Sequence, residues 1–220
     1  MYIPKHFHET DQAVIDQLIE ENPLATLITQ GSSGLNANHI PLHIVERPNP
    51  QGGVTRFLEG HVAKANSIVG ELRNNNSLLA IFVGVQRYIS PSLYASKKVD
   101  GKVVPTWNYE AVHIYGKVRL IEDEVGLMGI LKSLTHSQEH SLAKPWAIDD
   151  APADYTHKLM GAIVGFEVTI ERVEAKRKLS QNQPAHNQTS VISGLKGAAA
   201  DLQMSLAISS AIVASTTAKT

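Results

Sequence analysis

The chain has 220 residues, of which 43% are hydrophobic and 19% charged, the balance of an ordinary globular protein. Its formal net charge of -1 predicts no general attraction to nucleic acid or anionic lipid. The lack of cysteine excludes disulfides, thiolate metal sites and cysteine nucleophiles. The longest apolar runs are far shorter than the roughly 20 residues of a membrane span, and the first residues form no signal core. We therefore expect a cytoplasmic protein with no membrane partner.

The first third of the chain predicts one helix followed by strands. Residues 10–22 carry apolar side chains at helical spacing, with Thr10 or Asp11 as the cap and Pro23 as the stop. Strands are expected at 24–29, 36–46 and 54–62, separated by turns at 31–34 and 49–53. Within the second strand, Pro41 favours an edge, a bulge or a strand end.

The rest of the chain continues to alternate between the two periodicities. Helices are expected at 63–74, 122–140 and 152–160, and strands at 78–84, within 103–121 and at 163–173. Beyond Pro184 the chain becomes polar and then rich in alanine and serine, which predicts a helical appendage at about 188–213. Its apolar face is expected to hold Leu195, Ala199, Leu202 and Leu206.

About six strands with helices inserted between them predict a mainly β (α+β) protein with a mainly antiparallel sheet. A closed or split β-barrel with peripheral helices is the natural arrangement, because closure removes exposed sheet edges. We divide the chain into a barrel domain at 1–183 and the helical C-terminal appendage at 184–220.

One segment has the chemistry of a phosphate cradle. In EGHVAKAN (59–66) a strand ends where a helix is expected to begin. A helix N-terminus offers unpaired N–H groups and partial positive charge, Lys64 adds a full charge, and His61 and Asn66 add donors. The alternative is a solvated lysine in an ordinary turn, which the motif alone favours.

Three further polar segments each have a functional and a structural interpretation. Residues 87–96 gather Ser90, Ser92 and tyrosines including Tyr94 around a proline, either to hold a polyol chain or phosphate or simply to close a turn. Residues 104–113 place aromatic rings beside amide donors, which suits a planar ligand, an interface or a lid. The basic run 176–178 predicts an anion or nucleic-acid contact, or a solvated strand exit.

Metal and side-chain catalysis receive little support. Residues 136–140 read HSQEH, a literal H-x-x-E-H pattern, but that motif needs a helix that places both histidines on one face and a downstream carboxylate. The segment lies at an expected helix end, so we treat the match as chance. The sequence shows no Ser-His-Asp motif, phosphate-binding P-loop or Rossmann fingerprint. We therefore predict no catalytic side chain and no metal ligand.

Seven segments in order resemble the PaiB family, described as FMN-binding negative transcriptional regulators. They cover about residues 1–183 and comprise MYIPKHF, NANHIPL, GHVAKAN, YISPSLY, VPTWNY followed by VHIYG, KLMGAIVGFEV and KLSQNQ. VISGLK (191–196) extends the likeness into the tail. Three positions depart from the usual pattern, which has proline in place of Ser67 and tryptophan in place of Leu93 and Arg177.

The resemblance implies an FMN-binding split β-barrel shared with pyridoxamine-phosphate oxidase-like proteins, working as a homodimer with FMN at the subunit interface. Lys64 is implied as the main phosphate cation, and the later segments as further contacts, some from the partner subunit. The implied cofactor-binding residues are Asn38, His39, Ile40, Pro41, His61, Val62, Lys64, Ala65, Asn66, Ser90, Ser92, Tyr94, Thr106, Trp107, Asn108, Gln181 and Asn182.

Three functions follow from this resemblance. The first is a flavin-dependent redox protein, such as an FMN-dependent oxidoreductase with an unknown small-molecule substrate, which needs no side-chain base because the flavin carries the chemistry. A negative regulator of transcription would contact DNA, for which the basic run 176–178 is the only candidate, since no helix-turn-helix is evident. The departures from the pattern leave open a non-catalytic binding or regulatory module with an eroded flavin site.

Overall fold

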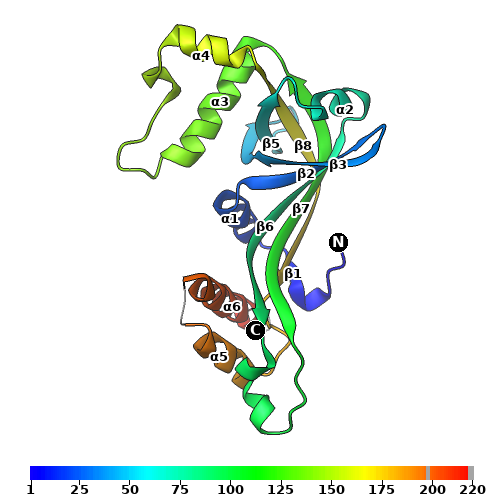
Figure 1. The fold of residues 1–220 in the computed structure, drawn as a ribbon, viewed down its shortest axis with the longest axis vertical. Helices are drawn as coiled ribbons and strands as arrows, with labels where there is room; N and C mark the ends of the chain where they lie inside the picture. The colour runs from blue at the N-terminus through cyan, green and yellow to red at the C-terminus, as the bar shows by residue number, and fades with distance from the viewer. Residues whose placement is uncertain (197–198, 218–220) are drawn as a thin grey trace. The chain divides into compact units, whose positions relative to one another are not determined.

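The computed structural model describes residues 1–196 and 199–217, and it divides into two compact units (Figure 1). The central unit consists of Ile19–Phe82 and His113–Val173. The terminal unit consists of Met1–Leu18, Val83–Val112 and the residues from Glu174 onward. Three long strands, β6 (Ser77–Ile89), β7 (Thr106–Ile121) and β8 (Ile163–Lys178), contribute residues to both units.

Eight strands form one sheet in the order β3-β2-β6-β7-β8-β5-β4, with β1 (His8–Glu9) added to β8. The other strands are β2 (Leu24–Gly31), β3 (Gly34–Pro41), β4 (His43–Pro48) and β5 (Val54–Ala63). The pairs with a recorded register are all antiparallel. The order ends at β3 and β4 without closing, so the expected mainly antiparallel sheet is confirmed and the barrel is split.

The central unit is built on strand alternation with short helices beside it. On β8, Val164, Phe166 and Val168 are fully buried, as their spacing predicts, and each such side chain contributes about 1.5–3 kcal/mol of burial energy. Helix α2 (Ile68–Asn74) buries its predicted apolar face. Helix α3 (Glu124–Glu139) packs against β5 and carries α4 (Ala153–Met160) at its side.

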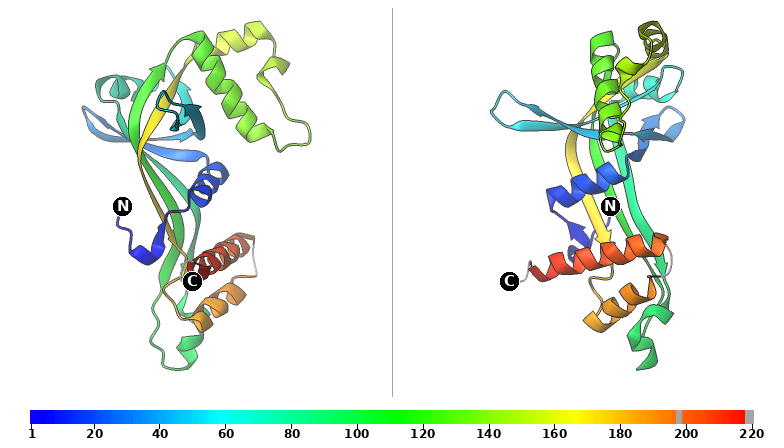
Figure 2. Two further views of the ribbon diagram at one scale, coloured as in Figure 1. Left: turned by 180° about the vertical axis from the view of Figure 1, so that it is seen from behind. Right: turned by 90° about the vertical axis from the view of Figure 1, so that its left-hand side faces the viewer.

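The terminal unit has a separate apolar cluster of buried residues. Ile89, Tyr94 and Leu179 pack with residues of α5 (Ala185–Gly194) and α6 (Ala199–Thr217), and Figure 2 shows these two helices side by side. The single tail helix expected at 188–213 is therefore two helices. Both lie in the same unit as β1 and α1 (Gln12–Glu21) up to Leu18.

The predicted apolar face of the tail was wrong. Leu202 and Leu206 are 48% and 62% exposed, whereas Met204 and Ile208 are fully buried. Leu195 is buried as expected, and the side chain of Ala199 lies outside the described residues. Apolar residues surround α6, so the sequence alone does not fix which side meets the cluster.

Several element boundaries also moved. The strand expected at 36–46 is two strands interrupted at Leu42, and Pro41 ends the first. The helix expected at 63–74 begins only at Ile68, because β5 keeps pairing with β8 as far as Ala63. The helix cap at the start of α1 is Asp11, whose Oδ1 accepts a hydrogen bond from Ala13 N at 2.9 Å.

Candidate functional site

The GHVAKAN segment forms the last four residues of β5 and the turn that follows them, and the helix does not begin at Lys64. Lys64 lies in this turn, exposed, and its Nζ donates to the backbone oxygen of Gly161 at 2.9 Å. Helix α2 starts four residues later and has only seven residues. The expected cradle of helix N–H groups at Lys64 is therefore wrong, and what remains is a cation on an exposed turn.

Beside this turn, two buried polar atoms have no partner among the described residues. Asn66 Nδ2 donates to Asn38 Oδ1 at 3.0 Å, and Asn66 Oδ1 accepts from Ile68 N at 3.1 Å. These contacts leave Asn38 Nδ2 and His61 Nδ1 buried and unsatisfied. An unsatisfied buried polar atom costs about 1–3 kcal/mol, so both atoms point to a polar ligand or solvent in the complete site.

His61 also lines a largely apolar cavity of about 280 Å³ whose wall includes Pro41, Leu42 and Trp146. Burial lowers the pKa of His61, so its imidazole is neutral at pH 7, with one nitrogen donating and the other accepting. Pro41 and His61, both implied flavin contacts, thus border one cavity.

The remaining implied contacts of the central unit differ in exposure. Ile40 and Val62 are core residues, each 5% exposed, so their side chains are not accessible to a ligand. His39 is exposed, with Nδ1 at 3.1 Å from Thr26 Oγ1, and Ala65 is exposed in the turn.

In the terminal unit, the YISPSLY segment forms a capped turn. Ser90 Oγ accepts from Ser92 N at 3.2 Å and caps the short 3-10 helix Pro91–Leu93. Lys97 Nζ donates to Ser92 Oγ at 2.9 Å. Tyr94 is 3% exposed within the apolar cluster, and burial raises its pKa. These side chains have the structural roles of a turn and a core.

The TWNY and KLSQN segments meet in the terminal unit. Lys178 Nζ donates to Thr106 Oγ1 and, at 2.6 Å, to the backbone oxygen of Trp107. Asn108 Nδ2 donates to Ser180 Oγ at 2.9 Å, while Asn108 Oδ1 is buried without a partner among the described residues. Ser180 has a positive φ of 66°, a conformation uncommon outside glycine.

Gln181 holds the strained turn at Ser180 closed. Its Oε1 accepts from Leu179 N at 2.7 Å, and its Nε2 donates to the backbone oxygen of Arg177 at 2.6 Å. Trp107 is 53% exposed and meets Tyr88 edge to face, with ring centroids 6.2 Å apart. Asn182 is exposed. Trp107 and Asn182, like Ser92, are thus implied contacts of this unit that remain exposed.

The basic run 176–178 is not a solvated strand exit. Lys176 and Arg177 are each only 7% exposed. Arg177 Nε donates to Glu110 Oε1 at 2.6 Å, and its NH1 lies 3.5 Å from Glu9 Oε2. The guanidinium at this unusual position is therefore neutralised by carboxylates, and the run offers little surface to DNA.

The H-x-x-E-H match falls at the end of α3. Helix α3 ends at Glu139, with His140 as its C-cap, and Glu139 Oε2 accepts from Trp146 N at 2.9 Å. Within residues 1–196 and 199–217, no group of three or more histidine, aspartate or glutamate side chains is placed to hold a metal ion. No helix in the described part of the chain is long and apolar enough to cross a bilayer.

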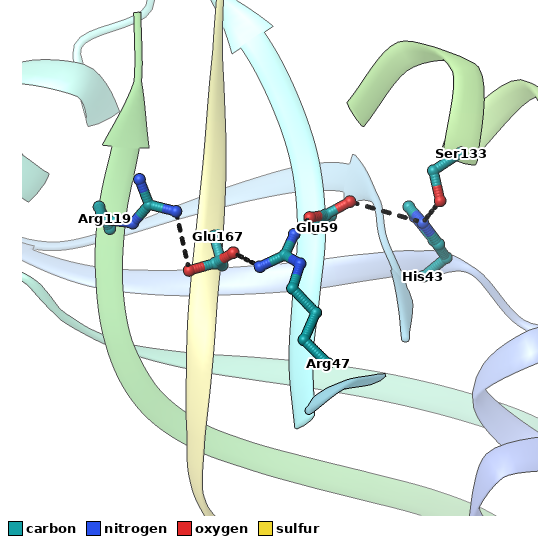
Figure 3. A network of polar contacts seen from close by, with 6 residues as sticks. All are labelled: His43, Arg47, Glu59, Arg119, Ser133 and Glu167. Atoms are coloured by element: carbon teal, nitrogen blue, oxygen red, sulfur yellow. Dashed lines mark hydrogen bonds and ion pairs between the residues drawn. The ribbon is translucent and has the colours of Figure 1, made fainter. Parts of the chain in front are cut away.

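Sequence reasoning missed a polar network on four adjacent strands of the central unit, drawn in Figure 3. Glu59 of β5 and Glu167 of β8 lie directly opposite each other in the strand register, and both are buried. Arg47 of β4 reaches both carboxylates, and Arg119 NH2 of β7 lies 3.3 Å from Glu167 Oε1. Like charges facing each other across a strand pair destabilise a sheet. The two arginines offset this repulsion between the glutamates.

At the β4 end, the network includes a histidine and a serine. His43 Nε2 lies 2.7 Å from Ser133 Oγ of α3 and 3.8 Å from Glu59 Oε2. Burial lowers the pKa of His43 and raises the pKa of Glu59, the latter opposed by Arg47. The available sequence signal was the run Phe57, Glu59, His61, in which acid and histidine occupy one face of a strand.

Comparison with known proteins places the chain in a family. Residues 1–172 match the family described as "Putative FMN-binding domain". The chain belongs to this FMN-binding family. A Bacillus subtilis protein named protease synthase and sporulation protein PAI 2 is 31% identical over 196 residues, 89% of this chain and 89% of that protein. The resemblance to PaiB, with FMN as the family's cofactor, is thereby confirmed.

The chain also resembles a fungal protein in sequence and a solved structure in fold. An uncharacterised protein of Emericella nidulans is 33% identical over 232 residues, 91% of this chain and 92% of that protein. The solved structure of the FAD and heme binding protein from Mycobacterium smegmatis superposes with a TM-score of 0.57 at 16% identity, covering 78% of this chain and 73% of that one. The structural likeness concerns the fold, and it confirms the split-barrel flavoprotein architecture.

Proposed function

We propose that this protein holds FMN as a resident cofactor through the 36–42 and 60–66 segments and acts as a flavin-dependent redox protein. The observation that carries the proposal is the coincidence of the family match with the two unsatisfied buried atoms, Asn38 Nδ2 and His61 Nδ1, in those segments. Both atoms can hydrogen-bond a polar ring edge or a polyol. Lys64, exposed on the adjoining turn, supplies the cation for a phosphate.

The residues present fit the needs of the cofactor. Bound FMN supplies hydride or single-electron transfer, and the protein supplies position and electrostatics. His61 is neutral, so it adds a hydrogen bond without adding charge beside the ring. Pro41, Leu42 and Trp146 give the cavity that His61 borders a largely apolar wall, the kind of surface that a planar ring contacts.

A homodimer is part of the proposal. The exposed Tyr88–Trp107 pair of the terminal unit is an aromatic surface of the kind enriched at interfaces, and the family resemblance implies contacts from a partner subunit. Light scattering on the purified protein, with and without added FMN, measures the mass directly. A monomer at micromolar concentration in both conditions would remove the dimer from the account.

The redox role is tested by spectroscopy. Protein purified without added cofactor, or loaded with FMN, is expected to absorb near the flavin bands and to bleach with a reduced nicotinamide or another hydride donor. FMN that binds but stays oxidised with every donor would favour the binding module with an eroded redox function. A regulatory role through DNA receives no support from the buried basic run, and a gel shift at physiological salt tests it.

A further inference from the structure

The Ser133–His43 pair lies outside the proposed flavin segments, and its serine lines a second cavity. This cavity, of about 360 Å³, is lined by Ser133, Glu59 and Arg47, by the glycines of α3 and by apolar residues of β4 and β7. Figure 3 shows Ser133 on α3 and His43 on β4 turned toward one another. A hydroxyl, an imidazole and a carboxylate from three separate elements therefore converge at the edge of a space large enough for a small organic molecule.

We propose that Ser133 is a nucleophile activated by His43 and that the cavity accepts small, uncharged acyl esters. The 2.7 Å separation of Ser133 Oγ from His43 Nε2 is the geometry of a nucleophile and its general base. Glu59 Oε2 lies 3.8 Å from the same nitrogen, so its charge favours the imidazolium that forms when the hydroxyl proton is taken. His43 Nδ1, the atom that an acid holds in a Ser-His-Asp triad, is buried without a partner among the described residues, so the pair is a dyad. The sequence does not predict this arrangement, because His43, Glu59 and Ser133 are far apart along the chain.

The surface of α3 beside Ser133 borders open space. Gly129 lies one turn before the serine, and a Cβ at this position would meet no heavy atom within 4 Å. Gly129 and Gly126 both line the cavity, although glycine weakens a helix interior. The open space beside the hydroxyl is where an acyl group would lie.

The charges around the cavity favour an uncharged substrate. Three carboxylates, of Glu59, Glu167 and Asp123, face two guanidinium groups, of Arg47 and Arg119, so the lining carries one excess negative charge and disfavours an anionic substrate. Arg47, which is 42% exposed, and Arg119 are the cationic side chains that line the cavity and could face charge that develops on an ester oxygen.

The reaction uses only ester and water. Ser133 Oγ bonds to the ester carbonyl carbon, its proton passes to His43 Nε2, and the carbon–oxygen bond to the alcohol breaks as that proton passes to the departing oxygen. Water then attacks the acyl-serine with the same histidine as base. The products are the acid and the alcohol, and no redox change occurs.

The test is covalent labelling of the full-length protein with a fluorophosphonate probe, followed by intact mass and peptide mapping. We expect one adduct on Ser133, its loss in Ser133→Ala, and a roughly 100-fold slower reaction in His43→Gln, the usual size of a general-base contribution. Ser137→Ala is the matched control, because Ser137 lies one turn further along α3 and its hydroxyl donates to the Leu134 oxygen. That variant should label at the wild-type rate.

A second variant separates reactivity from folding. Gly129→Leu places a side chain in the cavity and replaces glycine by a better helix former, so labelling should fall at least tenfold while circular dichroism and unfolding remain normal. Hydrolysis of p-nitrophenyl acetate should follow the same order of variants. An unlabelled Ser133 in folded protein, or equal labelling of wild type and His43→Gln, would overturn the proposal and leave the pair as a contact that anchors α3 to β4.

Discussion

Replacing Arg47 by methionine should lower the free energy of unfolding, because the repulsion between the facing glutamates is then no longer offset. Arg47 forms ion pairs with both Glu59 and Glu167, whose side chains are only 4% and 6% exposed. Breaking a fully buried ion pair costs about 3–5 kcal/mol. Because Arg47 itself is 42% exposed, solvent screens part of this energy, and we expect about 2–3 kcal/mol. For a chain of this length that corresponds to a melting temperature lower by roughly 5–10 °C.

The pH dependence gives the sharper test. Burial raises the pKa of Glu59 even with Arg47 present, and removing Arg47 raises it further. A carboxyl whose folded pKa lies above its unfolded value stabilises the fold at low pH and loses that contribution as pH rises through the folded pKa. The deficit of Arg47→Met relative to wild type should therefore grow between pH 5 and pH 8.

Urea unfolding followed by circular dichroism at both pH values measures this deficit. Arg73→Met is the matched control, because Arg73 pairs with Glu122 on the surface, where both side chains are more than half exposed, and it should cost under about 0.5 kcal/mol. Adding Glu167→Gln to Arg47→Met should restore part of the lost stability. Equal costs for the two arginines, or a deficit that shrinks as pH rises, would refute the reasoning.

Three further predictions concern the phosphate contact of Lys64, the buried face of α6 and the ion pair of Arg177. Lys64→Ala should weaken FMN binding at least tenfold, about 1.4 kcal/mol, while Lys117→Ala leaves it unchanged in a fluorescence titration; equal affinities would remove Lys64 from the phosphate site. Met204→Ala should cost about 2–5 kcal/mol and Leu206→Ala under about 0.5 kcal/mol in thermal unfolding, and the reverse order would restore the face expected from sequence. Arg177→Gln should destabilise the protein by about 3–5 kcal/mol, because it removes the buried guanidinium that pairs with the carboxylate of Glu110; a neutral result would show that solvent reaches this pair.

The sequence predicted the parts of the fold that depend on local periodicity. Val164, Phe166 and Val168 alternate on β8 as expected, and Ile68, Val69 and Leu72 form the buried face of α2. It failed where pairing partners decide the outcome. Continued pairing with β8 extends β5 to Ala63 and delays α2.

The candidate site shows the same limit. The segments that resemble the family identified FMN and drew attention to His61 and Lys64, but the amide and imidazole atoms left unsatisfied there depend on contacts between distant residues. The Glu59–Glu167 opposition depends on strand register, which one sequence does not specify. The sequence did not predict that the charge of Arg177 is neutralised, because the carboxylates that pair with it, Glu9 and Glu110, lie far away along the chain.

Flavin binding by wild type and by an Asn38→Leu, His61→Phe double variant tests the central claim most directly. Protein treated to remove any bound flavin is titrated with FMN, and quenching of flavin fluorescence reports the affinity. The account predicts saturable binding of one FMN per chain by wild type and a loss of at least tenfold in the variant, whose folding is checked by circular dichroism. Wild-type protein that does not bind FMN, or a folded variant that binds it as tightly, would contradict the account.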